Sequence, residues 1–528
     1  MDNLEVLIVA LFVSAAGLNA LARWLAIPYP IVLVIGGLVL GLLPGVPDVE
    51  LEPELVLLIF LPPLLYAAAF FSDLRSLRDN VRAISLTSIG LVLITAGVVG
   101  VIGHEVIGLS WPMAFALGAI VSPTDPVAAT AIMRRLGAPR RIVNLIEGES
   151  LVNDASALVA YRVAVGAAVG GSFSALDAGL EFLGSAAGGV AIGLVVGFVV
   201  TEIRRRLDDP VTEITISLLT AYAAFLPAEE LHVSGVLAAV TAGIYLGWMA
   251  PRIASPEMRL QGFAVWEVLI FLLNATLFIL IGLQLPVIVD GLTDWSLGEA
   301  IGYAALVCAV VIGTRFAWLF TVPYLIRLID RSEAQRARRV SAAPRVVVGW
   351  AGMRGAVSLA AALALPLETD AGAALPGRDL ILFIAFALIL FTVVVQGLTL
   401  PALIRRLGVT EDGSEEEAEE VRARLAAARA ALDRLDELEL EEWTRDETVE
   451  RARGLYRFRQ RRFGVRAGKI EDEEGIEDRS LVYQRMMHEV FAAQRNAVMA
   501  LRNTGEISSE VMRRVERELD LEESRLEV

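Results

Sequence analysis

Long apolar runs are the feature that most constrains how this chain can fold. Of its 528 residues, 55% are hydrophobic, and its mean hydropathy of +0.60 is too high for a soluble protein of this size. A helix that spans a bilayer needs about 20 mostly apolar residues. The sequence therefore predicts an all-α polytopic membrane protein with about 13 transmembrane helices. The thirteen runs lie near residues 4–22, 28–44, 54–72, 82–103, 112–133, 141–169, 178–203, 211–227, 232–250, 262–289, 297–324, 346–367 and 379–403.

Arginine residues alternate between the loops that join these runs. Loops after odd-numbered runs carry 19 Arg and no Lys, counting Arg82 and Arg141 at the edges of the following runs. Examples are Arg75, Arg78 and the group 204–206. Loops after even-numbered runs carry only Arg378. Basic residues concentrate in cytoplasmic loops, and a miscounted run would break the alternation. This pattern predicts a multi-pass protein of the plasma membrane with its N-terminus outside and its C-terminus in the cytoplasm.

Composition argues against several other classes of protein. The net charge of −16 disfavours a nucleic-acid partner, which needs a basic face. The single cysteine, Cys308, rules out an intramolecular disulfide framework and a multi-cysteine metal site. The N-terminus has no basic region and no cleavage pattern, so the first run is expected to be a retained span.

Charge also divides the chain into segments. Residues 1–408 hold 31 acids and 25 bases, whereas residues 409–528 hold 31 acids and 21 bases in a much shorter length. We expect a transmembrane domain at 1–408, an acidic linker at 409–420 and a cytoplasmic helical tail domain at 421–528. The tail shows helical spacing of apolar residues, and no motif in it indicates chemistry. The expected tail helices cover residues 421–440, 479–501 and 508–526.

The fifth run contains two prolines at its centre, in the sequence Ser122-Pro123-Thr124-Asp125-Pro126. Prolines at this spacing remove backbone donors and break a helix. Broken backbone inside a bilayer must be buried in protein or line a cavity. The freed Thr124 carbonyl and the Asp125 carboxylate are therefore candidate cation ligands. Asp125 as the N-cap of the second half-helix is a compatible alternative.

The sixth run carries a polar stripe. Glu149 and Asn153 are four residues apart, as are Ser150 and Asp154, so all four side chains share one face of an otherwise apolar helix. Desolvation favours the protonated form of a carboxylate. Asp154 is thus a candidate to hold either a proton or a cation, with Asp125 beside it. No catalytic residue and no cofactor are expected, because the predicted cation is cargo.

Two arginines lie inside apolar runs, where a lone guanidinium needs a carboxylate. Arg354 lies in the glycine-rich twelfth run and Arg315 in the eleventh. We expect Glu149 to pair with one of them and to act as an ionised support. Glu267 and Asn274 in the tenth run are candidates to line the core interface. A purely structural role for Glu267 is equally open. Arg162 receives no role.

Discontinuous helices in two halves of a chain are typical of inverted-repeat transporters with a site at the membrane midplane. The broken fifth run and the glycine-rich twelfth run fit this architecture in kind. If the two repeats are runs 2–7 and 8–13, these runs do not occupy equivalent positions. Run 5 is the fourth run of the first repeat, whereas run 12 is the fifth run of the second. Inverted repeats with broken helices are therefore expected, but the sequence leaves their alignment open.

Three motifs, each inside a span, resemble those of the monovalent cation:proton antiporter family of the NhaP and sodium–proton exchanger type. The likeness covers residues 1–408 and is specific because the motifs occur together and in this order. The motifs are residues 122–126, Gly148-Glu149-Ser150-Leu151-Val152-Asn153-Asp154, and Gly352-Met353-Arg354-Gly355-Ala356-Val357.

The resemblance implies a homodimer that works by alternating access. It implies that Asp154 is the central carboxylate, which binds the cation or the proton. The residues implied to complete the monovalent-cation site are Asp125, Ser150, Thr124 and Glu149. It also implies that Arg354, with Arg315 as a second candidate, is the supporting arginine. The resemblance further implies that Asn153 marks the branch that generally exchanges one proton for one cation without net charge movement.

The expected function is therefore exchange of protons for Na⁺, Li⁺ or K⁺, with the lipid bilayer and the transported ions as partners. An ion channel is one rival, but nothing in the sequence resembles a selectivity filter. An intramembrane hydrolase that uses Asp125 and Asp154 is a second rival, but no protease-like motif accompanies them. Counter-transport with a fixed exchange ratio would distinguish an antiporter from a channel. Cleavage of a single-span peptide would indicate a hydrolase.

Overall fold

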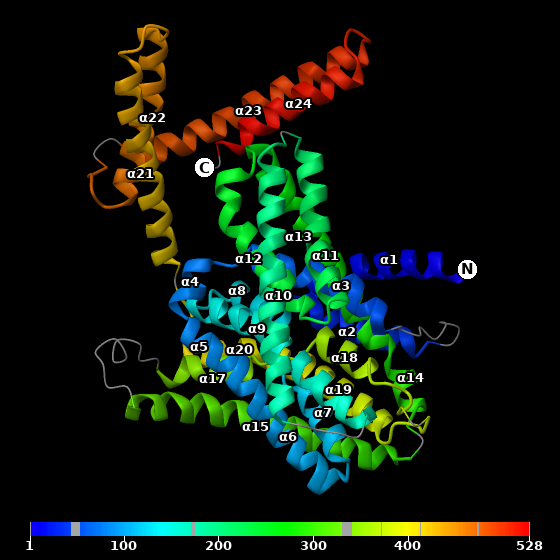
Figure 1. Ribbon diagram of the computed structural model, residues 1–528. Helices are drawn as coiled ribbons and strands as arrows, with labels where there is room; N and C mark the ends of the chain where they lie inside the picture. The colour runs from blue at the N-terminus through cyan, green and yellow to red at the C-terminus, as the bar shows by residue number, and fades with distance from the viewer. Residues whose placement is uncertain are drawn as a thin grey trace. The chain divides into compact units, whose positions relative to one another are not determined.

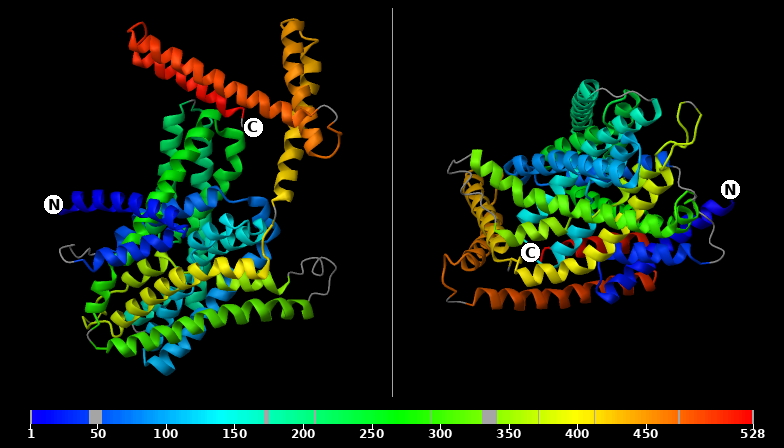
Figure 2. Two further views of the ribbon diagram at one scale, coloured as in Figure 1. Left: turned by 180° about the vertical axis from the view of Figure 1, so that it is seen from behind. Right: turned by 90° about the horizontal axis from the view of Figure 1, so that it is seen from below.

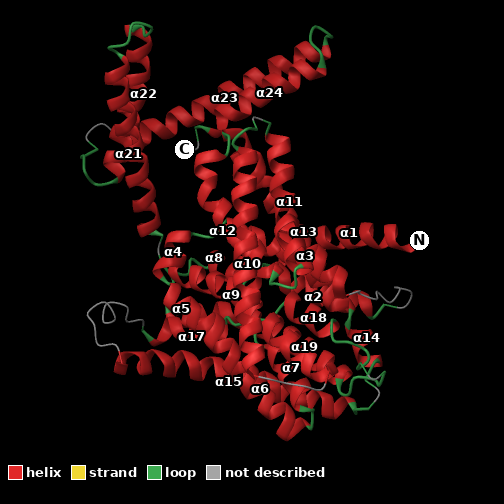
Figure 3. Cartoon of the chain, in the orientation of Figure 1, coloured by secondary structure: helices red, strands yellow, loops and turns green. Residues whose placement is uncertain are grey.

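The computed structural model describes residues 2–43, 53–170, 175–207, 209–292, 294–329, 341–370, 372–411, 413–472 and 475–526. Helices account for nearly all regular structure in these ranges (Figure 3). The described residues form one isolated β-bridge, between Glu368 and Ala374, and no strand. The chain divides into two compact units, Met1–Glu411 and Asp412–Val528. Parts of the predicted linker and tail, namely residues 412, 473–474 and 527–528, lie outside the described residues.

In the first unit, helices and broken helices occupy every predicted apolar run (Figure 1). Three short π-helical segments, η1–η3, interrupt longer helices. The helices up to the middle of the unit are α1 Asp2–Leu25, α2 Tyr29–Gly41, α3 Pro53–Phe70, α4 Leu74–Asp79, α5 Val81–Ser85, η1 Leu86–Leu91, α6 Val92–Ile102, η2 Gly103–Ile107, α7 Trp111–Val121, α8 Val127–Arg135, α9 Arg140–Gly170 and α10 Ala175–Arg204. The remainder are α11 Pro210–Glu230, α12 Gly235–Ile253, α13 Pro256–Leu283, α14 Leu285–Asp290, α15 Leu297–Ile329, α17 Ala342–Trp350, α18 Ala356–Leu363, α19 Arg378–Phe391, η3 Thr392–Gln396 and α20 Gly397–Leu407.

Eight helical segments among the described residues are long and apolar enough to cross a membrane, and four shorter apolar helices accompany them. The polytopic helical fold is therefore confirmed. The count of thirteen spans stays a prediction, because short and broken helices do not qualify by length alone. The inverted repeat likewise stays a prediction.

The helices pack in two neighbouring groups. Helices α10, α11 and α12 pack together and against α3 (Figures 1 and 2). A second group consists of helices α6, α7, α9, α15 and α19 together with the short helices α8, α17 and α18. Helix α13 packs closely on α2, where a β-carbon at Gly37 would overlap the Ile279 carbonyl and one at Gly282 would crowd the α2 backbone. Small residues allow this close approach of two apolar helices.

The second unit contains four helices: α21 Ser414–Leu438, α22 Asp446–Arg466, α23 Ile476–Asn503 and α24 Ser509–Ser524. Helix α21 begins at Ser414, inside the stretch expected to be a linker. Glu415, Glu416 and Glu417 fall in its first turn, where acidic side chains favour the positive end of the helix dipole. The basic stretch of α22, which was not assigned a structure from sequence, is also helical.

Candidate functional site

Two broken helices meet at the centre of the first unit. Helix α7 ends at Val121 and α8 begins at Val127, so the expected break at Pro123 and Pro126 is present. A second break separates α17 from α18 between Trp350 and Ala356. The two breaks contact each other, because the Asp125 amide donates a 2.8 Å hydrogen bond to the Met353 carbonyl. This bond pairs one backbone polar group from each break inside the protein, as irregular backbone in a bilayer requires.

Gly355 allows this contact. A β-carbon at position 355 would overlap the Asp125 carboxylate, so the close approach of the two breaks requires glycine. The Asp125 carboxylate also accepts a 2.9 Å hydrogen bond from the Val127 amide at the start of α8. Asp125 therefore has the local capping contact that the sequence suggested as an alternative, and it still faces the second broken helix.

The polar stripe of α9 lies against the first break. Thr124 Oγ1 donates to Glu149 Oε1 at 3.1 Å. Asn153 Nδ2 donates to Thr124 Oγ1 at 2.9 Å and to the Thr124 carbonyl at 3.3 Å. All three side chains are buried. The i,i+4 spacing of Glu149 and Asn153 thus fixes the threonine at the break from two sides.

Glu149 pairs with Arg315, which lies on α15. Two guanidinium nitrogens bind the two carboxylate oxygens, with Nη1–Oε1 2.5 Å and Nη2–Oε2 3.2 Å. A bidentate pair of this kind is the strong form of a charge-assisted hydrogen bond. Of the two arginines weighed from sequence, Arg315 is therefore the partner of Glu149.

Arg354 has different contacts from those expected. Its guanidinium donates to the Val121 carbonyl, with Nε–O 3.1 Å, and to the Gly352 carbonyl. Within the described residues it forms no salt bridge, so the expected carboxylate is replaced by backbone carbonyls. Val121 is the last residue of α7, whose terminal carbonyls lack helical partners. Arg354 thus binds the end of one broken helix from the break in another.

A cavity of about 500 Å³ opens beside these breaks. Thr124, Asp125, Ser150 and Asp154 all contribute to its wall, so four of the predicted ligands share one space. Asp154 is buried, and Asp125 is half-buried. Glu149, Asn153 and the two arginines are not among the lining residues and form a supporting layer instead.

This arrangement suits competition between a cation and a proton. Two carboxylates, a hydroxyl and a backbone carbonyl offer the oxygen atoms that hard cations prefer. The Thr124 carbonyl accepts from Asn153, but a carbonyl oxygen has a second lone pair. Two negative charges facing one small cavity are unfavourable unless a cation or a proton is present. The geometry therefore supports one bound cation or its replacement by a proton.

Several residues at this cavity escaped the sequence reasoning. Tyr29 lines it without any sequence signal. Arg134 and Glu147 also line it and form a 2.7 Å salt bridge. Glu147 precedes Ser150 by three residues, so extending the polar stripe of α9 towards its N-terminus would have found it. Asn274, named from sequence as an interface candidate, is buried and lines the same cavity.

Three other charged residues lie away from the cavity. Glu267 is exposed on α13 and is not among the lining residues. Arg162 pairs with Glu229 at 2.6 Å near the surface. Arg204, read from sequence as a loop residue, is fully buried and lies 3.4 Å from Glu213. Sequence position at the end of an apolar run gave no sign of that burial.

Comparisons with known proteins agree on one family. The family model described as "Sodium/hydrogen exchanger, transmembrane" matches residues 7–406. An uncharacterised Na⁺/H⁺ exchanger of Mycobacterium tuberculosis is 38% identical over 99% of this chain and 96% of its own length. The Na⁺/H⁺ antiporter ApNhaP of Aphanothece halophytica is 36% identical over 82% of this chain and 80% of its own. A sodium, potassium, lithium and rubidium/H⁺ antiporter of Bacillus subtilis is 33% identical over 76% of this chain and 62% of its own.

A solved structure supports the same architecture. The sodium proton antiporter MjNhaP1 from Methanocaldococcus jannaschii superimposes with a TM-score of 0.60 over 78% of this chain and all of that chain. The two sequences are 20% identical, so this likeness concerns the fold.

Proposed function

The chain belongs to the sodium/hydrogen exchanger family, and from that premise we propose that it exchanges protons for a monovalent cation across the membrane. Relatives named as Na⁺/H⁺ antiporters and as a sodium, potassium, lithium and rubidium/H⁺ antiporter support this activity. Na⁺ is the first expected cargo, with Li⁺ and K⁺ as further candidates. The ion is transported substrate, and no cofactor is proposed.

One observation carries the proposed site: Asp125 and Asp154 line the same cavity, beside the point where two broken helices contact each other. In the proposal, Asp154 binds either the cation or the proton. Asp125, Ser150 and the Thr124 carbonyl supply further oxygen ligands when the cation is bound.

Glu149 and Asn153 have supporting roles in this proposal. The Arg315 pair stabilises Glu149 in its ionised form, and the hydroxyl of Thr124 bridges it to Asn153. Asn153 carries no charge whether a cation or a proton is bound. The site therefore has one fewer titrating group than it would have with an aspartate at position 153. This supports exchange of one proton for one cation without net charge movement.

The membrane setting is part of the same proposal. Arginine-rich loops on one side support a plasma-membrane protein with the N-terminus outside and the C-terminal unit in the cytoplasm. Alternating access would expose the cavity to each side in turn. A homodimer is proposed from the family resemblance.

A flux assay tests the function. Purified protein in liposomes with an internal pH dye should move protons on addition of Na⁺, Li⁺ or K⁺, with the cation moving the opposite way. An imposed membrane potential should leave the rate unchanged if the exchange is electroneutral. Absence of cation-dependent proton movement would contradict exchange, whereas a potential-dependent rate would contradict only the one-to-one ratio.

A further inference from the structure

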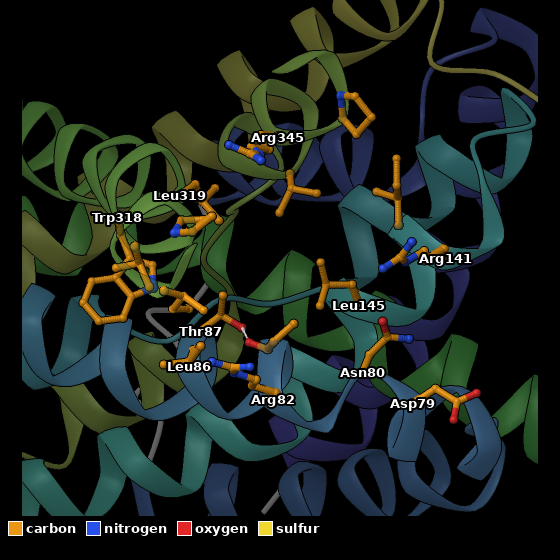
Figure 4. Close-up of a pocket in the computed structure, with 17 residues that line it drawn as sticks. Asp79, Asn80, Arg82, Leu86, Thr87, Arg141, Leu145, Trp318, Leu319 and Arg345 are labelled. Carbon is orange, nitrogen blue, oxygen red and sulfur yellow. Dashed lines mark hydrogen bonds between the residues drawn. The ribbon is translucent and has the colours of Figure 1, made fainter. Parts of the chain in front are cut away.

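A second cavity, of about 240 Å³, lies apart from the proposed ion site (Figure 4). Its wall comes from the junction of α4 and α5, from η1, from the first turns of α9, from the later part of α15 and from α17. None of the residues that line the ion-site cavity lines this one. It is thus a separate feature of the first unit.

The polar part of this cavity is basic. Arg82, Arg141 and Arg345 line it together with one acidic residue, Asp79 (Figure 4). Arg82, Arg141 and Asp79 are exposed, whereas Arg345 is buried, with its guanidinium 5.4 Å from the centroid of the Tyr324 ring. Basic residues on this wall outnumber acidic ones by three to one. A guanidinium has five N–H donors, so an arginine that already has a partner can still donate to an anion. This lining favours an anionic ligand.

The apolar part of the wall is larger than the polar part. Leu86, Leu145 and Leu319 contribute aliphatic surface, and Trp318 and Val322 extend it along α15. A free inorganic anion would gain nothing from this surface, because burial of apolar area stabilises only an apolar group. The wall fits a ligand with an anionic head and a hydrocarbon chain.

The cavity also lies at the depth of lipid headgroups. Arg82 is the second residue of the candidate span Val81–Glu105, and Arg141 is the second residue of Arg140–Gly170. On α15 the cavity reaches Ile326, the last residue of the candidate span Leu297–Ile326. Two spans begin and one ends at this level, so all three meet the same membrane surface. The arginine bias assigns that surface to the cytoplasm, whose leaflet carries anionic lipids.

We propose that this cavity binds one anionic phospholipid, with the phosphate near Arg82, Arg141 and Arg345 and the upper acyl chain along Trp318 and Leu145. The lipid would hold α15 against α9. Trp318 is three residues from Arg315, and Leu145 is four residues from Glu149, so the site adjoins the buried pair. The choice of the cytoplasmic leaflet rests on the orientation proposed above, whereas the binding itself rests on the lining of the cavity.

Thermal unfolding of the full chain in mild detergent tests the site. Phosphatidylglycerol should raise the unfolding temperature more than phosphatidylcholine with the same chains, and inorganic phosphate should have no effect. Arg141→Gln should require about fivefold more phosphatidylglycerol for the same shift, the factor expected for one arginine near an anionic surface. Arg141 is exposed, so this variant should fold. Arg141→Lys should keep most of the response.

The matched control is Arg75→Gln, which removes an exposed arginine of the neighbouring helix α4 that does not line the cavity. Its lipid response should equal that of the unmodified chain. Equal shifts with both lipids, or equal losses in Arg75→Gln and Arg141→Gln, would overturn the proposal. A full shift with inorganic phosphate alone would overturn it in favour of a simple anion site. Loss of exchange with the lipid response intact would contradict the proposed function and support the separate lipid site.

Discussion

Arg315 and Glu149 form a bidentate ion pair in which both side chains are almost completely buried, with exposed fractions of 2% and 1%. The pair joins α15 to α9 one turn from Asn153 and Asp154. Its strength comes from charge and from two parallel hydrogen bonds between buried groups. This pairing supports the proposal that Glu149 stays ionised and positions Thr124, while Asp154 and Asp125 exchange ions.

Removal of one partner from the pair should destabilise the protein. Arg315→Met leaves the Glu149 carboxylate buried without its counter-charge, and such a loss costs about 3–5 kcal/mol. The double variant Arg315→Met with Glu149→Met should recover part of that loss, because two apolar side chains replace both charges. Unfolding temperatures in detergent measure the effect. A single variant as stable as the unmodified chain would show that the pair contributes little.

Asp154→Asn should abolish cation-dependent proton movement while the protein still folds. Asparagine has nearly the shape of aspartate but binds no proton in exchange for a cation. The assay is dye-monitored flux in liposomes, with the unfolding temperature as a check on folding. Glu267→Gln is the control, since it neutralises an exposed carboxylate on α13 that does not line the cavity. Exchange that survives in Asp154→Asn would rule out the proposed site.

Gly355→Ala should disrupt the contact between the two broken helices. The added methyl group would overlap the Asp125 carboxylate, so either the side chain or the break must shift, and exchange should fall strongly. Gly313→Ala is the matched control, because a β-carbon there meets no described atom within 4 Å. Alanine in a helix interior is favoured over glycine by about 0.5–1 kcal/mol. Comparable flux in both variants would contradict the role of the close contact.

Arg354→Ala should lower stability for a reason different from a lost ion pair. Its guanidinium binds the carbonyls of Val121 and Gly352, and removal leaves both buried acceptors without that donor. Hydrogen bonds to charged groups contribute about 1.5–3 kcal/mol each. We expect reduced yield and a lower unfolding temperature. If the loss arose instead from an unpaired carboxylate, a second substitution of Glu149→Gln would restore it, and we expect no such rescue.

The salt bridge between Arg134 and Glu147 should tune cation affinity, because both residues line the cavity. Glu147→Gln leaves a net positive charge there and should raise the KM for the cation. Arg134→Gln leaves a net negative charge and should lower it. Each change should be under about fivefold, since partly exposed charges interact by about 1 kcal/mol or less. Added inert salt should shrink both effects, and shifts in the same direction would contradict an electrostatic cause.

Local features of the site were predictable because local geometry produces them. Pro123 and Pro126 favour the break between α7 and α8, since each proline removes a backbone donor. The stripe from Glu149 to Asp154 follows from helical periodicity alone. Apolar length predicted membrane helices in the same way. Each of these depends on residues close together in sequence.

Tertiary packing decided which of these groups touch. Glu149 had two candidate partners, and the packing of α15 against α9 selects Arg315, whereas Arg354 lies at the second break and binds carbonyls. The burial of Arg204 beside Glu213 likewise depends on helices that pack around it. Sequence spacing determines which face of a helix a side chain occupies. The rotation and depth of one helix against another determine what that face meets.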